Sequence, residues 1–283
     1  MSKAEDTNVT SKTKANDASK NARDAKAAKE AVKAEPPKPV RVLFIGNSQV
    51  SCVADIPEIV EDLSHSSPAD APRVQSDAVV IGGVPLEKLW DDGQAVTKIR
   101  AGRWDWVVVQ EMIGWPETRK DVMFKYVRLF RGEIEKAGGK MLLFAVPQVE
   151  GKRDAHRIIY AANLEIAREF IPAAEKPGTV AGLTAKVMGK PADVQPASVR
   201  AAGCGAAWLK AWAARPNLNL HHTDRAHPNL LGYYLNACVI YAAITDRNPA
   251  GLDACGLPAD DAKSAQKIAW EQYSEDRREE QKK

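Results

Sequence analysis

Long apolar runs are missing from this sequence. It has no stretch of about 18 or more apolar residues, the length that a helix needs to cross the hydrocarbon core of a membrane. It also has no apolar segment of signal-peptide type near its start. We therefore expect no membrane-spanning segment, and these features assign no cellular compartment to the protein.

Cysteine is scarce, with four residues in 283 and no spacing typical of a disulfide framework or a zinc site. Cys52 and Cys238 fall in predicted helices with apolar neighbours, where a free thiol packs as a small hydrophobic group. A disulfide between Cys204 and Cys255 stays open as an alternative. None of the four follows a glycine turn at the end of a predicted strand, so a cysteine nucleophile is disfavoured.

Large apolar side chains are nearly absent from residues 1–38, which are rich in Ala, Lys, Asp, Ser and Asn. Such a segment cannot bury enough surface to offset the entropy lost on ordering, so we predict a disordered arm. The arm carries nine basic and six acidic residues, and the rest of the chain carries 31 of each sign. A globular part with balanced charge does not indicate nucleic-acid binding.

From residue 40 onward, short apolar runs alternate with longer segments of helical periodicity. This pattern is typical of parallel strands buried on both faces and joined by crossover helices. We predict a three-layer α/β/α domain over 39–258 with a mostly parallel five-stranded sheet of flavodoxin type, then a charged helix that frays into a tail over 259–283. The predicted strands are 41–46, 77–82, 105–110, 140–146 and 197–202. The predicted helices before the last one are 51–65, 85–101, 121–137, 154–171, 205–214 and 229–245.

Residues 175–197 contain several glycines and prolines and show little periodicity. Loops of this length without regular structure are often functional lids, and a plain surface loop is the alternative. The sequence leaves both open.

Polar or flexible residues follow the carboxyl ends of three predicted strands. Ser48 follows the first strand in a Gly-Asn-Ser turn, Gly82 and Gly83 follow the second, and Gln110 ends the third. Ligands of parallel α/β sheets bind beyond this edge, so we expect these segments to converge on one site.

A second constellation lies near the other end of the chain, where Asp224 and His227 are three residues apart just before an apolar helical run. A histidine held in one tautomer by an aspartate can take the proton of a serine hydroxyl. Ser48, His227 and Asp224 are therefore the candidate catalytic triad of a hydrolase. Taken alone, the Asp-x-x-His pattern could equally be a surface turn or a helix cap.

The neighbouring His221 and His222 add further possible metal ligands to Asp224 and His227. We disfavour a metal site because the sequence has no Cys-x-x-Cys or His-Glu-x-x-His spacing and because a serine nucleophile has no use in one. We expect neither a metal nor another cofactor.

The order of these motifs resembles the SGNH, or GDSL-type, esterase and lipase family over roughly residues 41–250. Gly46-Asn47-Ser48 matches the first family block, and Asp224 and His227 match the fifth. The resemblance implies that Ser48 is the nucleophile and that its N–H is one oxyanion donor. It implies a second donor from the N–H of Gly83 or, less favoured, Gly82.

The third family block usually reads Gly-x-Asn-Asp, whereas this chain has Gln110 and Glu111 after an apolar strand, which looks like a branch of the family with Gln-Glu at this place. The resemblance implies that the amide of Gln110 is the third oxyanion donor. Glu111 either holds the loop or contacts the substrate. Asn47 and Trp115 are weaker candidates for substrate binding, Trp115 by stacking or as a core residue.

The resemblance implies a serine esterase that hydrolyses small acyl esters, including acetyl groups on carbohydrates, through a covalent acyl-enzyme. The expected partner is a small-molecule or carbohydrate ester. Two alternatives stay open: an O-acyltransferase with the same chemistry, and a catalytically silent carbohydrate-binding or scaffold domain with the same fold.

Overall fold

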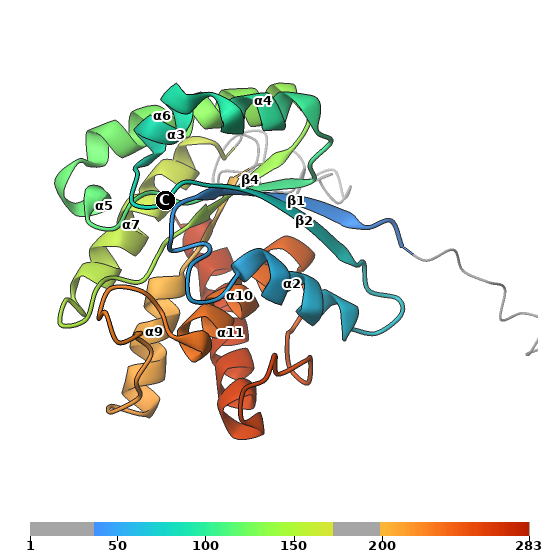
Figure 1. Ribbon diagram of the computed structural model, residues 1–283, viewed down its shortest axis with the longest axis vertical. Coiled ribbons are helices and arrows are strands. Elements are labelled where there is room, and N and C mark those ends of the chain that lie inside the picture. Colours follow the sequence, from blue (N-terminus) through green and yellow to red (C-terminus); the bar gives the residue numbers. More distant parts are fainter. Residues whose placement is uncertain (1–36, 172–198, 283) are drawn as a thin grey trace, which may run out of the picture. The chain divides into compact units, whose positions relative to one another are not determined.

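A sheet of five parallel strands in the order β2-β1-β3-β4-β5 forms the centre of the protein (Figure 1). The computed structural model describes residues 37–171 and 199–282, so the predicted arm up to residue 36 and the segment 175–197 lie outside the described residues. The α/β class and the five strands are confirmed. The strands are β1 (Val40–Gly46), β2 (Val74–Val80), β3 (Trp106–Val109), β4 (Lys140–Phe144) and β5 (Val199–Ala202).

Helices cover both faces of the sheet. One layer contains α3 (Leu86–Asp92), α4 (Gln94–Ala101) and α6 (Lys120–Lys136), and the other contains α2 (Ile56–His65), α9 (Cys204–Ala214), α10 (Leu230–Thr245) and α11 (Ala259–Glu280) (Figure 1). The short α5 (Trp115–Thr118) and α7 (Ala155–Glu169) complete the described helices. In the parts of the chain that the structure describes, no helix is long and apolar enough to span a membrane.

The side chains of β1 alternate between the two layers, as the pleat of a strand requires. Val42 and Phe44 belong to the core that includes α2 and α10, whereas Leu43 and Ile45 belong to the core that includes α3 and α6. All four side chains have no exposed surface. Burial on both faces explains why this strand reads as a continuous apolar run in the sequence.

Two predicted helices differ from the observed ones. The helix predicted over 85–101 is divided into α3 and α4 at Gly93, whose φ of 80° lies in the left-handed region that favours glycine. The helix predicted from residue 51 begins only at Ile56, because Asp55 caps it with a side-chain bond to the N–H of Glu58. Cys52 therefore precedes the helix and is exposed.

The four cysteines are all free, so the alternative of a disulfide between Cys204 and Cys255 is wrong. Cys238 is buried in α10, as expected for a thiol that packs as a hydrophobic group. Asp154 occupies the N-cap position of α7 without a side-chain bond to the helix.

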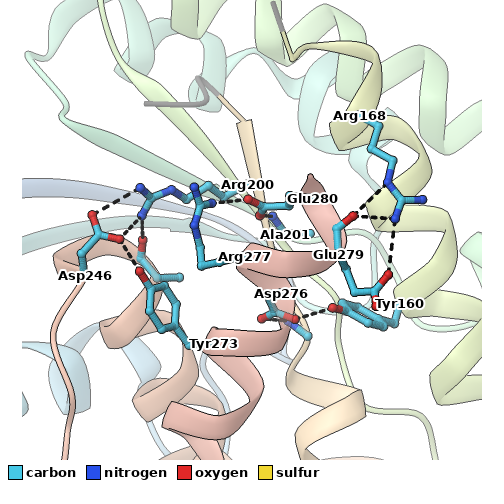
Figure 2. A network of polar contacts seen from close by, with 12 residues as sticks. Tyr160, Arg168, Arg200, Ala201, Asp246, Tyr273, Asp276, Arg277, Glu279 and Glu280 are labelled. Atoms are coloured by element: carbon cyan, nitrogen blue, oxygen red, sulfur yellow. Dashed lines mark hydrogen bonds and ion pairs between the residues drawn. The ribbon is translucent and has the colours of Figure 1, made fainter. Parts of the chain in front are cut away.

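Helix α11 covers the outer edge of β5 with two carboxylates that are four residues apart (Figure 2). Asp276 accepts a hydrogen bond from the N–H of Gly203 (3.0 Å), and Glu280 accepts one from the N–H of Ala201 (2.9 Å). An edge strand otherwise leaves such N–H groups unpaired. The helix is therefore packed as far as Glu280 instead of fraying, and it belongs to the same compact unit as the rest of residues 38–283.

The carboxyl group of Asp276 is expected to make stability depend on pH. Burial raises its pKa to about 7, although bonds from the N–H of Gly203 and from the Tyr160 hydroxyl act in the opposite direction. Between about pH 4 and about 7, the folded protein thus holds a proton that the unfolded chain has lost, and this contribution to stability falls as pH rises. The variant Asp276→Asn lacks this proton. Its free energy of unfolding relative to wild type should rise by up to about 1.4 kcal/mol per pH unit across that window.

Denaturant unfolding of both proteins at several pH values measures this difference. The comparison with wild type is needed because the buried imidazole of His156, with a pKa lowered to about 4 by burial, changes stability with pH in the opposite direction in both proteins. A difference that stays constant with pH would show that Asp276 does not hold the proton.

Candidate active site

Ser48 lies in the turn that follows β1, at the carboxyl edge of the sheet. The N–H of Asn47 donates to Oε1 of Gln110 (2.7 Å), and Oδ1 of Asn47 accepts from the N–H of Gln49 (3.1 Å). A Cβ atom at Gly46 would lie 2.5 Å from Oε1 of Gln110, so only glycine fits before this turn. These contacts leave the Ser48 side chain partly exposed on a rigid backbone.

Ser48, His227 and Asp224 form one chain of hydrogen bonds, although Ser48 is 179 residues from His227 in the sequence. Nε2 of His227 lies 2.8 Å from Oγ of Ser48, and Nδ1 of His227 lies 2.6 Å from Oδ2 of Asp224. This is the arrangement in which a histidine can remove the serine proton while an aspartate fixes its tautomer.

The loop that carries Asp224 and His227 is held in shape by its own backbone. The N–H of His222 donates to the carbonyl of His227 (2.8 Å), and Arg225 takes the left-handed φ of 63° that the turn requires. Asn229 caps α10 by accepting from the N–H of Gly232 (3.0 Å). His227 is thereby fixed just before the first turn of α10, as predicted.

Asp224 is a permanent anion at neutral pH. Its Oδ1 accepts from the N–H groups of His227 (3.0 Å) and Ala226 (2.9 Å), and with the bond to the imidazole these contacts hold its pKa well below the usual range. The carboxylate is partly exposed, with 43% of its side-chain surface accessible. Its two oxygens have separate tasks, because Oδ1 shapes the loop and Oδ2 faces the histidine.

The contacts of Gln110 correct the role expected for it. Its side chain has no exposed surface, its Oε1 accepts from the N–H of Asn47, and its Nε2 donates to the carbonyl of Glu111. The amide is turned inward and does not lie where a substrate oxygen could reach it. Gln110 therefore holds the turn of the nucleophile instead of donating to an oxyanion.

Two backbone N–H groups at this edge, those of Ser48 and Gly83, donate to no acceptor in the described part of the chain. Gly83 is exposed and takes a left-handed φ of 69°. The loop that contains it is tied to the nucleophile turn, because Nδ2 of Asn47 donates to the carbonyl of Val84 (2.9 Å). Free N–H groups held near a nucleophile are what a developing oxyanion needs.

Asn47 and Glu111 were candidates for substrate binding, and the structure gives them internal partners instead. Asn47 is 3% exposed and Glu111 is 4% exposed. Oε1 of Glu111 accepts from the N–H groups of Leu86 (3.1 Å) and Met112 (2.6 Å), so Glu111 holds the start of α3. Burial raises the pKa of Glu111 to about 7. The buried side chains of Asn47 and Glu111 therefore hold the backbone of the loops around the site.

Trp115 begins α5 and is half-buried, with the guanidinium carbon of Arg119 4.8 Å from its ring centroid. His221 turns away from Asp224. Its Nε2 lies 3.0 Å from the carbonyl oxygen of Gln148, and its ring packs against Trp208 at 4.9 Å between centroids. The His221 side chain therefore packs in the core of this structure.

Sequence reasoning missed three residues that hold the site together. Gln49 donates from Nε2 to the carbonyl of Ala226 (3.2 Å), Tyr233 donates to the carbonyl of Ser48 (2.7 Å), and Gln148 contacts His221. For Gln49 and Tyr233, the one feature of the sequence that could have indicated a role in the site is a position near a motif. Gln49 follows Ser48, and Tyr233 lies six residues after His227.

Replacing Gln110 with alanine is expected to lower the free energy of unfolding by roughly 1–3 kcal/mol, because the buried N–H of Asn47 loses its acceptor. Denaturant unfolding measures this loss, and kcat on the same preparation measures the activity of the folded fraction. Unchanged stability together with a kcat lowered about a hundredfold would restore the oxyanion role.

Comparison with known proteins supports the fold. No family model and no curated protein matches the sequence. Among solved structures, the chain is similar to a DUF4886 family protein from Bacteroides uniformis, with 16% identity, 82% of this chain and 93% of that chain covered, and a TM-score of 0.57.

Weaker similarity, at TM-scores below 0.5, extends to two further structures. One is a putative SGNH hydrolase from Slackia heliotrinireducens, with 20% identity, 74% of this chain and 100% of that chain covered, and a TM-score of 0.48. The other is a lipase/acylhydrolase from Enterococcus faecalis, with 16% identity, 74% and 96% covered, and a TM-score of 0.47.

The fold and the site together define a three-layer α/β protein with a serine, a histidine and an aspartate at the carboxyl edge of its sheet. More particularly, the fold is similar to that of the DUF4886 family protein.

Proposed function

We propose that this protein is a serine hydrolase that cleaves small acyl esters through a covalent acyl-enzyme. The observation that carries this proposal is the continuous contact from Asp224 through His227 to Ser48, with distances of 2.6 and 2.8 Å. A structural role alone does not require a partly exposed serine to face a histidine whose other nitrogen faces an ionised carboxylate.

In the proposed reaction, Oγ of Ser48 attacks the ester carbonyl carbon while its proton passes to Nε2 of His227. The imidazolium is stabilised by the anionic Asp224, which accepts from Nδ1. The same proton then moves to the leaving alcohol oxygen as the carbon–oxygen bond breaks. Water then attacks the acyl carbon and gives a proton to Nε2 of His227. This proton passes to Oγ of Ser48 as the bond between Oγ and the acyl carbon breaks, so that the acid is released and Ser48 and His227 are regenerated.

The negative charge that develops on the carbonyl oxygen is assigned to the free N–H groups of Ser48 and Gly83. Because Gln110 is turned inward, no side-chain amide from the end of β3 joins them. One oxyanion donor contributes about two to three orders of magnitude in rate, so a hole built from backbone donors alone should give a modest kcat.

The substrate class follows from the sequence resemblance, which implies short acyl groups, including acetyl groups on carbohydrates. Initial rates on p-nitrophenyl esters of increasing acyl length, and acetate release from an acetylated oligosaccharide, test it directly. We expect wild-type protein to hydrolyse the acetyl ester and His227→Gln to lose this activity. Wild-type protein that hydrolyses no ester faster than His227→Gln would contradict the proposal.

A further inference from the structure

Two buried side chains join the nucleophile turn to the segment that carries His227. The hydroxyl of Tyr233, in the first turn of α10, donates to the carbonyl oxygen of Ser48 at 2.7 Å. Nε2 of Gln49 donates to the carbonyl oxygen of Ala226, the residue before His227, at 3.2 Å. Both bonds connect residues more than 170 positions apart in the sequence.

We propose that Tyr233 and Gln49 are positioning residues that hold Oγ of Ser48 at proton-transfer distance from His227. This inference rests on the proposed function in one respect: the geometry that the two residues maintain is useful only if Ser48 is a nucleophile. The contacts themselves do not depend on the reaction.

The bond from Tyr233 completes the restraint on the Ser48 backbone. The peptide group before Ser48 is fixed because its carbonyl, that of Asn47, accepts from the N–H of Val50 (2.8 Å). The peptide group after Ser48 is fixed because its carbonyl accepts from Tyr233 (2.7 Å). With both flanking peptide groups held, the direction of the Ser48 side chain is set, while the N–H of Ser48 donates to no acceptor among the described residues.

The bond from Gln49 acts on the other partner. Its acceptor is the carbonyl of Ala226, and the next N–H along the chain, that of His227, donates to Asp224 (3.0 Å). Gln49 therefore fixes the peptide group that leads into His227. Gln49 is 3% exposed, and Tyr233 has no exposed surface, so both donor side chains are buried.

The neighbouring Tyr234 is a control for the loss of a buried hydroxyl. Its hydroxyl donates to the carbonyl oxygen of Asp253 at 2.7 Å and also accepts from Nε2 of Gln266 at 2.7 Å, and its side chain has no exposed surface. Tyr233→Phe and Tyr234→Phe each remove one hydroxyl from adjacent positions of α10, and Tyr234→Phe should cost at least as much stability as Tyr233→Phe, about 1 kcal/mol or more. Only Tyr233→Phe removes a contact to Ser48.

The kinetic test compares the two tyrosine variants on p-nitrophenyl acetate. A misplacement of the reacting atoms by about 1 Å can cost about a hundredfold in rate. We expect Tyr233→Phe and Gln49→Leu to lower kcat by about tenfold to a hundredfold with little change in KM, because the substrate still binds. We expect Tyr234→Phe to keep the wild-type kcat. Equal kcat values for Tyr233→Phe and Tyr234→Phe would overturn the proposal.

A second test does not require activity. The chain has five histidines, so the ¹⁵N spectrum of histidine-labelled protein is simple, and His227→Gln assigns the signal of His227. Ser48→Ala removes the partner of Nε2 and shows the shift that results when this contact is lost. We expect the Nε2 signal of Tyr233→Phe to move toward that of Ser48→Ala and the signal of Tyr234→Phe to stay at the wild-type position.

The spectrum separates the two proposals. If the His227 signal of Tyr233→Phe moves as expected but wild-type protein hydrolyses no ester, the positioning role stands and the proposed function fails. If the signal of Tyr233→Phe stays with wild type, the positioning role fails whatever the activity.

Discussion

Replacing Ser48 with alanine is expected to lower the rate of ester hydrolysis by at least about four orders of magnitude while the protein keeps its fold. The hydroxyl is the group that forms the covalent bond to the acyl carbon, and no other residue can take its place in that step. Within residues 37–171 and 199–282, this hydroxyl has one hydrogen-bond partner, Nε2 of His227, so its removal should change the free energy of unfolding by no more than about 1 kcal/mol.

The measurement is kcat/KM for p-nitrophenyl acetate, with the unfolding midpoint determined on the same preparation. Ser51 provides a matched control, because its hydroxyl donates to Oδ2 of Asp55 (2.6 Å), away from His227. Ser51→Ala should keep the wild-type rate. Hydrolysis by Ser48→Ala at a substantial fraction of the wild-type rate would remove Ser48 from the mechanism.

Replacing Asp224 with asparagine is expected to lower kcat by roughly three to four orders of magnitude. Oδ1 of the carboxylate accepts from the N–H groups of Ala226 and His227, so the oxygen of an asparagine must take that place. The amide nitrogen then faces Nδ1 of His227 and donates to it. The histidine is forced into the tautomer with its proton on Nε2, which cannot accept the proton of Ser48.

This effect can be separated from damage to the loop by its pH dependence. Because the pKa of Asp224 lies well below its usual range, a fall of wild-type activity on mild acidification should not report protonation of Asp224. Asp224→Asn should keep the loop and the unfolding midpoint while losing activity at every pH. An asparagine variant with nearly wild-type kcat would show that Asp224 does not fix the tautomer.

The strands of the sheet could be predicted because a strand that is buried on both faces reads as a continuous apolar run in the sequence. β1 reads as a continuous apolar run, and its two sets of side chains are indeed buried in opposite cores. The convergence of the segments that carry Ser48, Gly83 and Gln110 could also be predicted, since the carboxyl ends of parallel strands meet at one edge. The pairing of Ser48 with His227 was predicted from the Asp-x-x-His pattern and the family resemblance.

The orientation of Gln110 could not be predicted. The sequence shows an amide at the end of β3, but its direction depends on which partner it finds, and here the N–H of Asn47 and the carbonyl of Glu111 bind both of its ends. The contact between Tyr233 and Ser48 has a related explanation, because 185 residues separate the two and no local pattern records the pairing.

The packing of the last turns of α11 was missed for a different reason. Its last turns are rich in charge, which predicts a solvated tail. The sequence does not show that the outer edge of β5 presents N–H groups at Ala201 and Gly203 that need acceptors. Asp276 and Glu280 accept hydrogen bonds from these two N–H groups. Their side chains are buried, at 2% and 3% exposure.

The most direct test of the central claim is to identify the residue that a fluorophosphonate labels, by mass spectrometry of peptides from the treated protein. If His227 activates Ser48, the phosphonyl group should be found on Ser48 in wild-type protein, should be absent from Ser48→Ala, and should form far more slowly in His227→Gln. Label on another residue, or labelling of Ser48 at the same rate with and without His227, would contradict the proposed triad.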